Sequence, residues 1–198
     1  MLDTRKRKPA WLALVLLAGA FGGPAPAQED AAVSSPARIA EATARGLEFL
    51  RREQTPEGCW RADIGYKLME DYRVTSDVLD QRRHGGGHVG VSSLAVIAFL
   101  AGGHVPGRGP YGSVIERGIR YVLDCTSAED GYVSQNGSRM YSHAFATLCL
   151  AEAYGMTHEG GLRTKLQDAV DLIVKSQNAA GSWRYVPFAQ DSDMSITV

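Results

Sequence analysis

The residues in this sequence that could do chemistry are two aspartates near its end and one histidine at the start of an apolar segment. Asp191 and Asp193 are separated by one residue, and a carboxyl group becomes an unusually strong acid only when its neighbours stabilise the anion. The alternative, which we favour, is that one of them caps the helix that follows by accepting hydrogen bonds from its first backbone N–H groups. His143 is either a catalytic or ligand-binding group or, as we favour, a buried histidine bonded to a nearby loop.

The other histidines and the cysteines do not have the spacing of a metal site. His84 and His88 flank three glycines, which make a loop that is not pre-organised for a metal, so we predict a flexible hinge into the next helix. The spacing of Cys59, Cys125 and Cys149 fits no zinc pattern. We therefore expect no metal and no cofactor.

Two kinds of helix must position these residues. Helical periodicity predicts amphipathic helices over residues 36–54, 112–123 and 161–176. Nearly every position is apolar over residues 89–100 and 141–154, and a helix that is apolar all round must be buried on every side. A third such helix is predicted to open within residues 191–198.

The two kinds of helix alternate with a period of about 50 residues, and one pair cannot bury its own apolar helix. Pairs stacked side by side can place the apolar helices on an inside ring and the amphipathic ones outside. The predicted fold class is therefore all-α, with α/α toroid-type helical-pair repeats that form an incomplete ring, or arc. We predict a repeat domain over residues 36–198 with an irregular charged insertion at residues 61–88.

The turns that follow the amphipathic helices repeat a pattern of their own. The first has Gln54, Gly58 and Trp60, and the last has Gln177, Gly181 and Trp183. The middle copy keeps Gly131 but has Thr126 where the glutamine is expected, and Tyr132 replaces the Gly-x-Trp ending. We predict that these residues tie the end of each outer helix to the next unit, more loosely in the middle copy.

The N-terminus has the features of a secretory signal peptide. A basic segment (5–8), a short apolar segment (11–20) and the small-x-small sequence Ala25-Pro26-Ala27 predict a leader over residues 1–27, followed by a flexible linker over 28–35. We therefore expect an exported protein, periplasmic or extracellular. The formal net charge is -1, with no basic stripe, so nucleic acid is not an expected partner.

The stretch from Arg45 to Trp60, RGLEFLRREQTPEGCW, resembles the QW repeat of the prenyltransferase and squalene-oxidase repeat superfamily. In that superfamily the glutamine and tryptophan are structural. The likeness covers roughly residues 36–198 and implies a terpene-cyclase-like α/α toroid. It also implies a truncated member, because the sequence stops at the opening of the third apolar helix.

The resemblance also suggests a catalytic motif. Triterpene cyclases of this superfamily, such as squalene-hopene cyclase, carry Asp-x-Asp-Asp-Thr, whose middle aspartate protonates the polyene. The stretch Asp191-Ser192-Asp193-Met194-Ser195 is similar in its first and third positions, and Met194 replaces the next aspartate. Asp193, with Asp191, is the position where the resemblance would place the acid. The aspartate, cysteine and histidine that hold zinc in protein prenyltransferases have no match here.

Three functions are compatible with these features, because fold alone does not decide function. We expect an exported repeat protein whose helical arc binds a partner protein or an apolar ligand, such as an isoprenoid or a lipid. The alternative is a terpene-cyclase-like or prenyltransferase-like enzyme acting on an isoprenoid. A polysaccharide-active enzyme is the third, although no pair of carboxylates stands out. The incomplete C-terminal end further predicts self-association.

Overall fold

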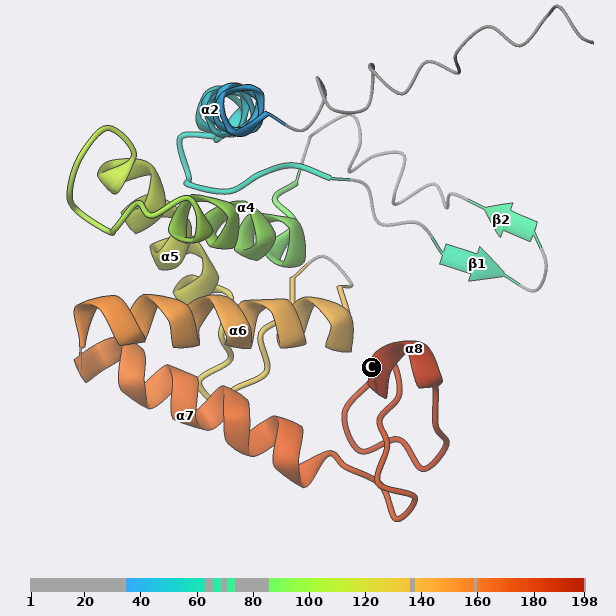
Figure 1. Ribbon diagram of the computed structural model, residues 1–198. Coiled ribbons are helices and arrows are strands. Elements are labelled where there is room, and N and C mark those ends of the chain that lie inside the picture. The colour runs from blue at the N-terminus through green and yellow to red at the C-terminus, as the bar shows by residue number, and fades with distance from the viewer. Residues whose placement is uncertain are drawn as a thin grey trace, which may run out of the picture. The chain divides into compact units, whose positions relative to one another are not determined.

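The computed structural model describes residues 35–62, 66–68, 71–73, 86–135, 138–158 and 160–197. The predicted signal peptide, His84 and most of the insertion lie outside this part of the chain. The all-α fold of toroid-type helix pairs is confirmed, with two short antiparallel strands inside the insertion as an addition (Figure 1). The elements are α2 (Pro36–Glu53), β1 (Tyr66–Leu68), β2 (Asp71–Arg73), α4 (Val89–Ala101), α5 (Gly112–Asp124), α6 (Met140–Thr157), α7 (Gly160–Lys175) and α8 (Met194–Thr197).

Local capping explains where the first helices begin. Pro36 opens α2, and the Ser35 hydroxyl accepts a hydrogen bond from the Arg38 backbone N–H at 3.4 Å. His88, predicted to be part of a hinge, caps α4 instead, because its Nδ1 accepts from the Val91 N–H at 3.3 Å. The imidazole therefore satisfies a backbone donor of the helix that follows.

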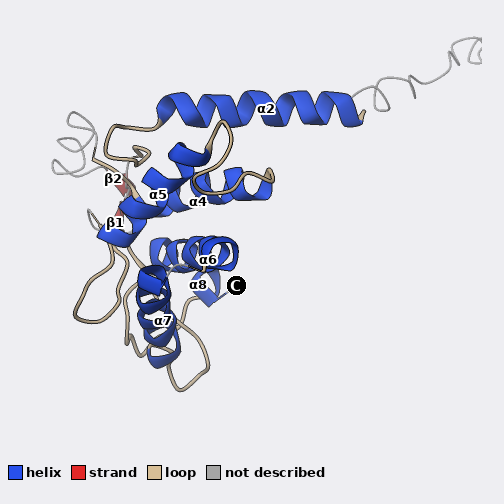
Figure 2. Cartoon of the chain, turned by 90° about the vertical axis from the view of Figure 1, so that its left-hand side faces the viewer, coloured by secondary structure: helices blue, strands red, loops and turns tan. Residues whose placement is uncertain are grey.

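The compact unit spans Thr43–Val198, and of the other unit, Met1–Ala42, the structure describes only residues 35–42 at the start of α2. The inner helices α4 and α6 pack side by side and run in the same direction (Figure 1). Their first turns touch, since a Cβ on Gly90 would lie 2.7 Å from the Ser142 hydroxyl. The outer helix α5 packs on both inner helices, and α7 packs on α6 (Figure 2).

The core lies between the inner and outer helices. Burying an apolar side chain of this size stabilises a fold by about 1.5–3 kcal/mol, so these contacts hold the pairs together. Apart from His143, the largest fully buried side chains are apolar: Phe99, Ile115, Leu150 and Leu162. No helix in the described part of the chain is long and apolar enough to cross a membrane.

The prediction of a third buried helix near residues 191–198 is wrong in one respect. A helix does begin there, as α8, but none of its residues is buried and Met194 is 77% exposed. Its contacts are hydrogen bonds rather than apolar packing: the Tyr141 hydroxyl donates to Ser195 Oγ at 2.5 Å, and the hydroxyls of Ser182 and Thr197 lie 2.6 Å apart. Met194 therefore lies in solvent, while Ile196 is half-buried.

Candidate functional site

The first joint (Gln54–Trp60) and the third joint (Gln177–Trp183) are built in the same way. In both, the glutamine Nε2 donates to the carbonyl oxygen of the glycine four residues later, at 3.0 Å. In both, the tryptophan Nε1 donates at 2.8 Å to the carbonyl ten residues earlier, in the last turns of the outer helix. These bonds fold each turn back onto its own helix, which is a structural role.

The first joint also binds the next outer helix, α5. Gln54 Nε2 donates to the Val114 carbonyl at 2.9 Å, and Arg117 Nη2 donates to Gln54 Oε1 at 2.5 Å. Gly58 has a φ of 91° and lies so close to α5 that an added Cβ would be 2.7 Å from the Arg117 carbonyl carbon. The glycine therefore serves both the turn and the contact.

The middle joint (Thr126–Tyr132) has other connections in place of the glutamine. The Thr126 hydroxyl donates to the Val122 carbonyl at 3.2 Å, within its own helix. Lys165 Nζ of α7 donates to the Leu123 carbonyl at 2.6 Å, and a Cβ on Gly131 would lie 2.6 Å from the Asp168 backbone. The predicted loosening is therefore not seen, because α7 is held by different groups.

His143 supplies a further connection at the middle joint. Its side chain is fully buried, and its Nδ1 accepts from the Val133 N–H at 3.1 Å. Nε2 therefore carries the proton and donates to the Ala169 carbonyl, also at 3.1 Å. Burial lowers the pKa of this imidazole, because the charged form is penalised away from water. Both nitrogens are used by the backbone, so neither is available to a substrate or a metal.

The other predicted residue, Asp193, lies in a polar cluster at the start of α8. One carboxylate oxygen accepts from the Ser195 N–H at 2.9 Å and from the Ser195 hydroxyl at 2.5 Å. The Tyr185 hydroxyl also bonds to this carboxylate, and Arg184 Nη1 is 4.0 Å away. Asp193 is thus an N-cap, as the favoured interpretation has it. Asp191 pairs with the same Arg184 at 3.3 Å, but its side chain is 68% exposed.

The electrostatics of the cluster stabilise the carboxylate. The Ser195 hydroxyl, then the Tyr185 hydroxyl and the Ser195 N–H, hold the pKa of Asp193 below its ordinary value. The group is therefore an anion at neutral pH. Stabilisation of its anion makes the Asp193 carboxyl a stronger acid. However, only the protonated carboxyl can donate a proton, and at neutral pH little of it is protonated.

The cluster adjoins an exposed apolar surface that we call the inner face: Leu94 of α4 with Tyr141, Phe145, Leu148 and Met156 of α6. Leu94 and Phe145 occupy equivalent positions of the two parallel helices, so they lie on the same side. Each of the five side chains is more than one-third exposed. The Tyr141 hydroxyl bonds Ser195, which places the Asp193 carboxylate at the N-terminal end of the inner face.

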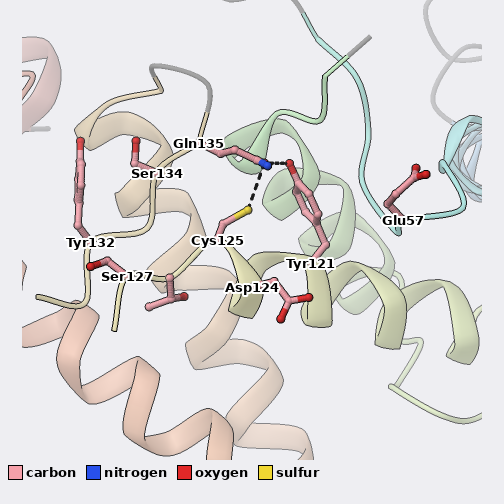
Figure 3. Close-up of a pocket in the computed structure, with 9 residues that line it drawn as sticks. Glu57, Tyr121, Asp124, Cys125, Ser127, Tyr132, Ser134 and Gln135 are labelled. Atoms are coloured by element: carbon pink, nitrogen blue, oxygen red, sulfur yellow. Dashed lines mark hydrogen bonds between the residues drawn. The ribbon is translucent and has the colours of Figure 1, made fainter. Parts of the chain in front are cut away.

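A separate pocket of about 570 Å³ opens at the middle joint (Figure 3). Gln135 reaches into it and bonds the Tyr121 hydroxyl and the Cys125 thiol. Burial raises the pKa of Cys125 to about 11, so its thiol stays protonated and is a poor nucleophile. We did not predict this pocket. Its only signal in the sequence is that Thr126 and Tyr132, which line it, depart from the repeat.

Metal-binding residues do not converge in the described part of the chain. No group of three or more histidine, cysteine, aspartate or glutamate side chains there could hold a metal ion. The three cysteines are free, with Cys59 and Cys149 buried. Burial raises the pKa of Cys149 to about 12, so its thiol stays protonated.

Comparison with known proteins gives the following. No family model matches the sequence, and no curated protein matches it. Among solved structures, the chain is similar to variants of the type II terpene cyclase MstE from Scytonema. One, in complex with geranylgeranyl dihydroxybenzoate (substrate), is 20% identical over 75% of this chain and 36% of that chain, with a TM-score of 0.48. Another, in complex with merosterolic acid A (product), is 19% identical over 80% and 42%, with a TM-score of 0.49. This chain spans less than half the length of those cyclases.

Proposed function

We propose that this chain is a terpene-cyclase-like helical repeat protein that binds an isoprenoid-class apolar ligand along the inner face. The observation that carries the proposal is the row of exposed side chains on two adjacent parallel helices, Leu94, Phe145 and Leu148 among them. An exposed apolar surface of this kind marks a binding site more often than a solvated surface. The predicted likeness to QW-repeat proteins supports the same class of ligand.

The arrangement of the inner face suits an amphiphilic chain better than a polar ligand. Its middle offers carbon atoms at Phe145 and Leu148, and the exposed Glu152 follows one turn later. Its N-terminal end carries the Tyr141 hydroxyl and the Asp193 carboxylate. A ligand with a hydrocarbon chain and a hydroxyl head group could bury the chain on the middle of the inner face. Its hydroxyl group could then form hydrogen bonds at the N-terminal end. The proposal therefore assigns the ligand a direction as well as a class.

Binding can be tested with geranylgeraniol by isothermal titration calorimetry. Changing Phe145→Asp and Leu148→Asp together is expected to weaken binding at least about tenfold, since burial of each apolar side chain contributes on the order of 1.5 kcal/mol. Val174→Asp is the matched control, because Val174 is an exposed apolar residue on the outer helix α7. Equal affinity of the double variant and the wild type, or no saturable binding by the wild type, would sink the proposal.

Terpene-cyclase-like catalysis is a second candidate, favoured by one observation. The Asp193 carboxylate is stabilised by three hydrogen-bond donors at the end of the inner face, and stabilisation of its anion is what an alkene-protonating acid needs. In the cyclase motif an aspartate stands where this chain has Met194. We therefore place cyclase activity second to ligand binding in this proposal.

Incubation of the protein with squalene, followed by mass spectrometry of cyclised products, tests that second candidate. Asp193→Asn keeps a cap for α8 but removes the acid, so product should fall at least about 100-fold if this carboxyl donates the proton. Asp191→Asn is the control, because that side chain is mostly exposed. Product formation that survives Asp193→Asn would remove this residue from the mechanism.

A further inference from the structure

A further pocket, of about 440 Å³, is formed by consecutive elements of the compact unit. Its lining comes from the loop that joins α4 to α5, from α5 itself, from the last residue of α6 and from the first turn of α7. It shares no residue with the inner face or with the pocket at the middle joint. Its volume lies in the lower part of the range of small-molecule sites, which is about 300–1,000 Å³.

Part of the lining of this pocket is aliphatic. Ile119 of α5 and Leu162 of α7 are 6% and 1% exposed, and both contribute to the pocket. Leu123 and Pro106, which are half-buried, extend this surface. Such a surface stabilises the hydrocarbon part of a ligand by removing apolar area from water. The pocket therefore suits a ligand with a short aliphatic group.

The wall formed by α5 carries two opposite charges. Glu116 and Arg120 are one helical turn apart, and both line the pocket. A glutamate four residues before an arginine is well placed for an ion pair on a helix, but the ion pairs of the described residues lie elsewhere. The Glu116 carboxylate lies instead against the turn at Gly107, where an added Cβ would be 2.7 Å from Oε1. The carboxylate and the guanidinium therefore face the pocket as two separate groups.

We propose that this pocket binds the zwitterion of an aliphatic α-amino acid such as leucine. The ammonium group of the ligand would pair with the Glu116 carboxylate, and its carboxylate would accept two hydrogen bonds from the Arg120 guanidinium. The Thr157 hydroxyl donates to the Ala153 carbonyl at 2.9 Å, so its oxygen keeps a lone pair that can accept from the ammonium group. The branched side chain of the ligand would lie on the aliphatic part of the lining.

The combination of groups disfavours other small ligands. A carboxylic acid or an alkylamine would pair with only one of the two charges, and its own charge would be repelled by the other. An amino acid with a charged side chain would bring that charge onto Ile119 and Leu162, where it would lose its hydration. This inference does not depend on the proposed binding of an isoprenoid, because the two sites have no residue in common.

Equilibrium dialysis of the full chain against radiolabelled L-leucine tests the proposal, and saturable binding is the expected result. Two analogues then compete for the site: isocaproate, which is leucine without its ammonium group, and isoamylamine, which is leucine without its carboxylate. Each should compete at least about tenfold less well than unlabelled leucine, because each loses a charge-assisted hydrogen bond. Competition by either analogue that equals competition by leucine would contradict recognition of the zwitterion.

Two variants assign the charges to residues. Glu116→Gln and Arg120→Gln should each weaken leucine binding at least about tenfold. The first should also reduce the preference for leucine over isocaproate, and the second the preference for leucine over isoamylamine. Both side chains are exposed, and circular dichroism verifies that each variant is folded.

Glu129→Gln and Arg163→Gln are the matched controls for these variants. They remove the same charges from exposed residues that do not line the pocket, so both should bind leucine as the wild type does. A wild type without saturable binding at millimolar leucine, or binding that neither Glu116→Gln nor Arg120→Gln weakens, would overturn the proposal.

Discussion

Replacing Gly58 with alanine is expected to lower the free energy of unfolding by about 3 kcal/mol. Gly58 has a φ of 91°, where an L-residue with a Cβ is strained by about 1–2 kcal/mol. The new Cβ would also overlap the Arg117 backbone of α5, and overpacking of a rigid contact costs about 1–3 kcal/mol more. Urea denaturation followed by far-UV circular dichroism measures the loss.

Gly181→Ala is the matched control for this prediction. Gly181 holds the same place in the third joint with a φ of 75°, but an added Cβ there meets no backbone. This variant should therefore show the conformational cost alone, about 1–2 kcal/mol. If both variants lose equal stability, the packing of the first joint on α5 contributes nothing, and our description of that joint is wrong.

Replacing His143 with leucine is expected to cost about 3 kcal/mol or more. The substitution keeps the volume roughly constant but leaves the Val133 N–H and the Ala169 carbonyl without partners in a fully buried place. Each unsatisfied buried group costs about 1–3 kcal/mol. His143→Gln, which can offer an acceptor and a donor, should recover part of the loss, and the difference between the two variants in urea midpoints measures it.

The same histidine should make stability depend on pH. Burial holds its folded-state pKa below the ordinary 6.5, so just below pH 6.5 the unfolded chain binds more protons than the folded one. The free energy of unfolding therefore rises with pH in this range: the contribution is complete above about pH 6.5 and is lost as the pH falls towards the folded-state pKa. His88, whose pKa burial also lowers, adds to the trend in the same direction.

Comparison of wild type with His143→Gln isolates the His143 contribution. Stability of both proteins should be measured at several pH values between 5 and 8, and the variant should show the shallower dependence. An identical slope in the two proteins would mean that His143 is not buried as a neutral imidazole.

The helices were predictable because their signals are local. The apolar periodicity placed α2, α5 and α7 within one or two residues of their observed bounds, and the continuous apolar runs placed α4 and α6. The prediction that the inner helices are buried on every side is wrong for the inner face, where Leu94, Phe145 and Leu148 are each more than one-third exposed. The repeat spacing then set which helices pair: α5 packs on α4 and α6, and α7 packs on α6.

What the sequence did not indicate depends on contacts between distant residues. Thr126 looked like the loss of a connection, but Lys165 and His143 restore it from α7 and α6, and no local pattern encodes such compensation. The hairpin of β1 and β2 lies in a charged segment without strand alternation. The exposure of α8 depends on what packs against it, which the apolar character of Met194 and Ile196 could not show.

The three joints link the helix pairs in series, and they do not respond alike to their surroundings. The first joint is closed on α5 by an amide and a guanidinium, neither of which changes charge between pH 5 and 8. The middle joint includes a buried imidazole, His143, whose protonation would break its hydrogen bond with the Val133 N–H. Repeat units connected in this way unfold in a single cooperative transition only if every joint between them is stable. We therefore expect acid to weaken the middle joint, which connects α7 to the rest of the unit, before it weakens the first joint.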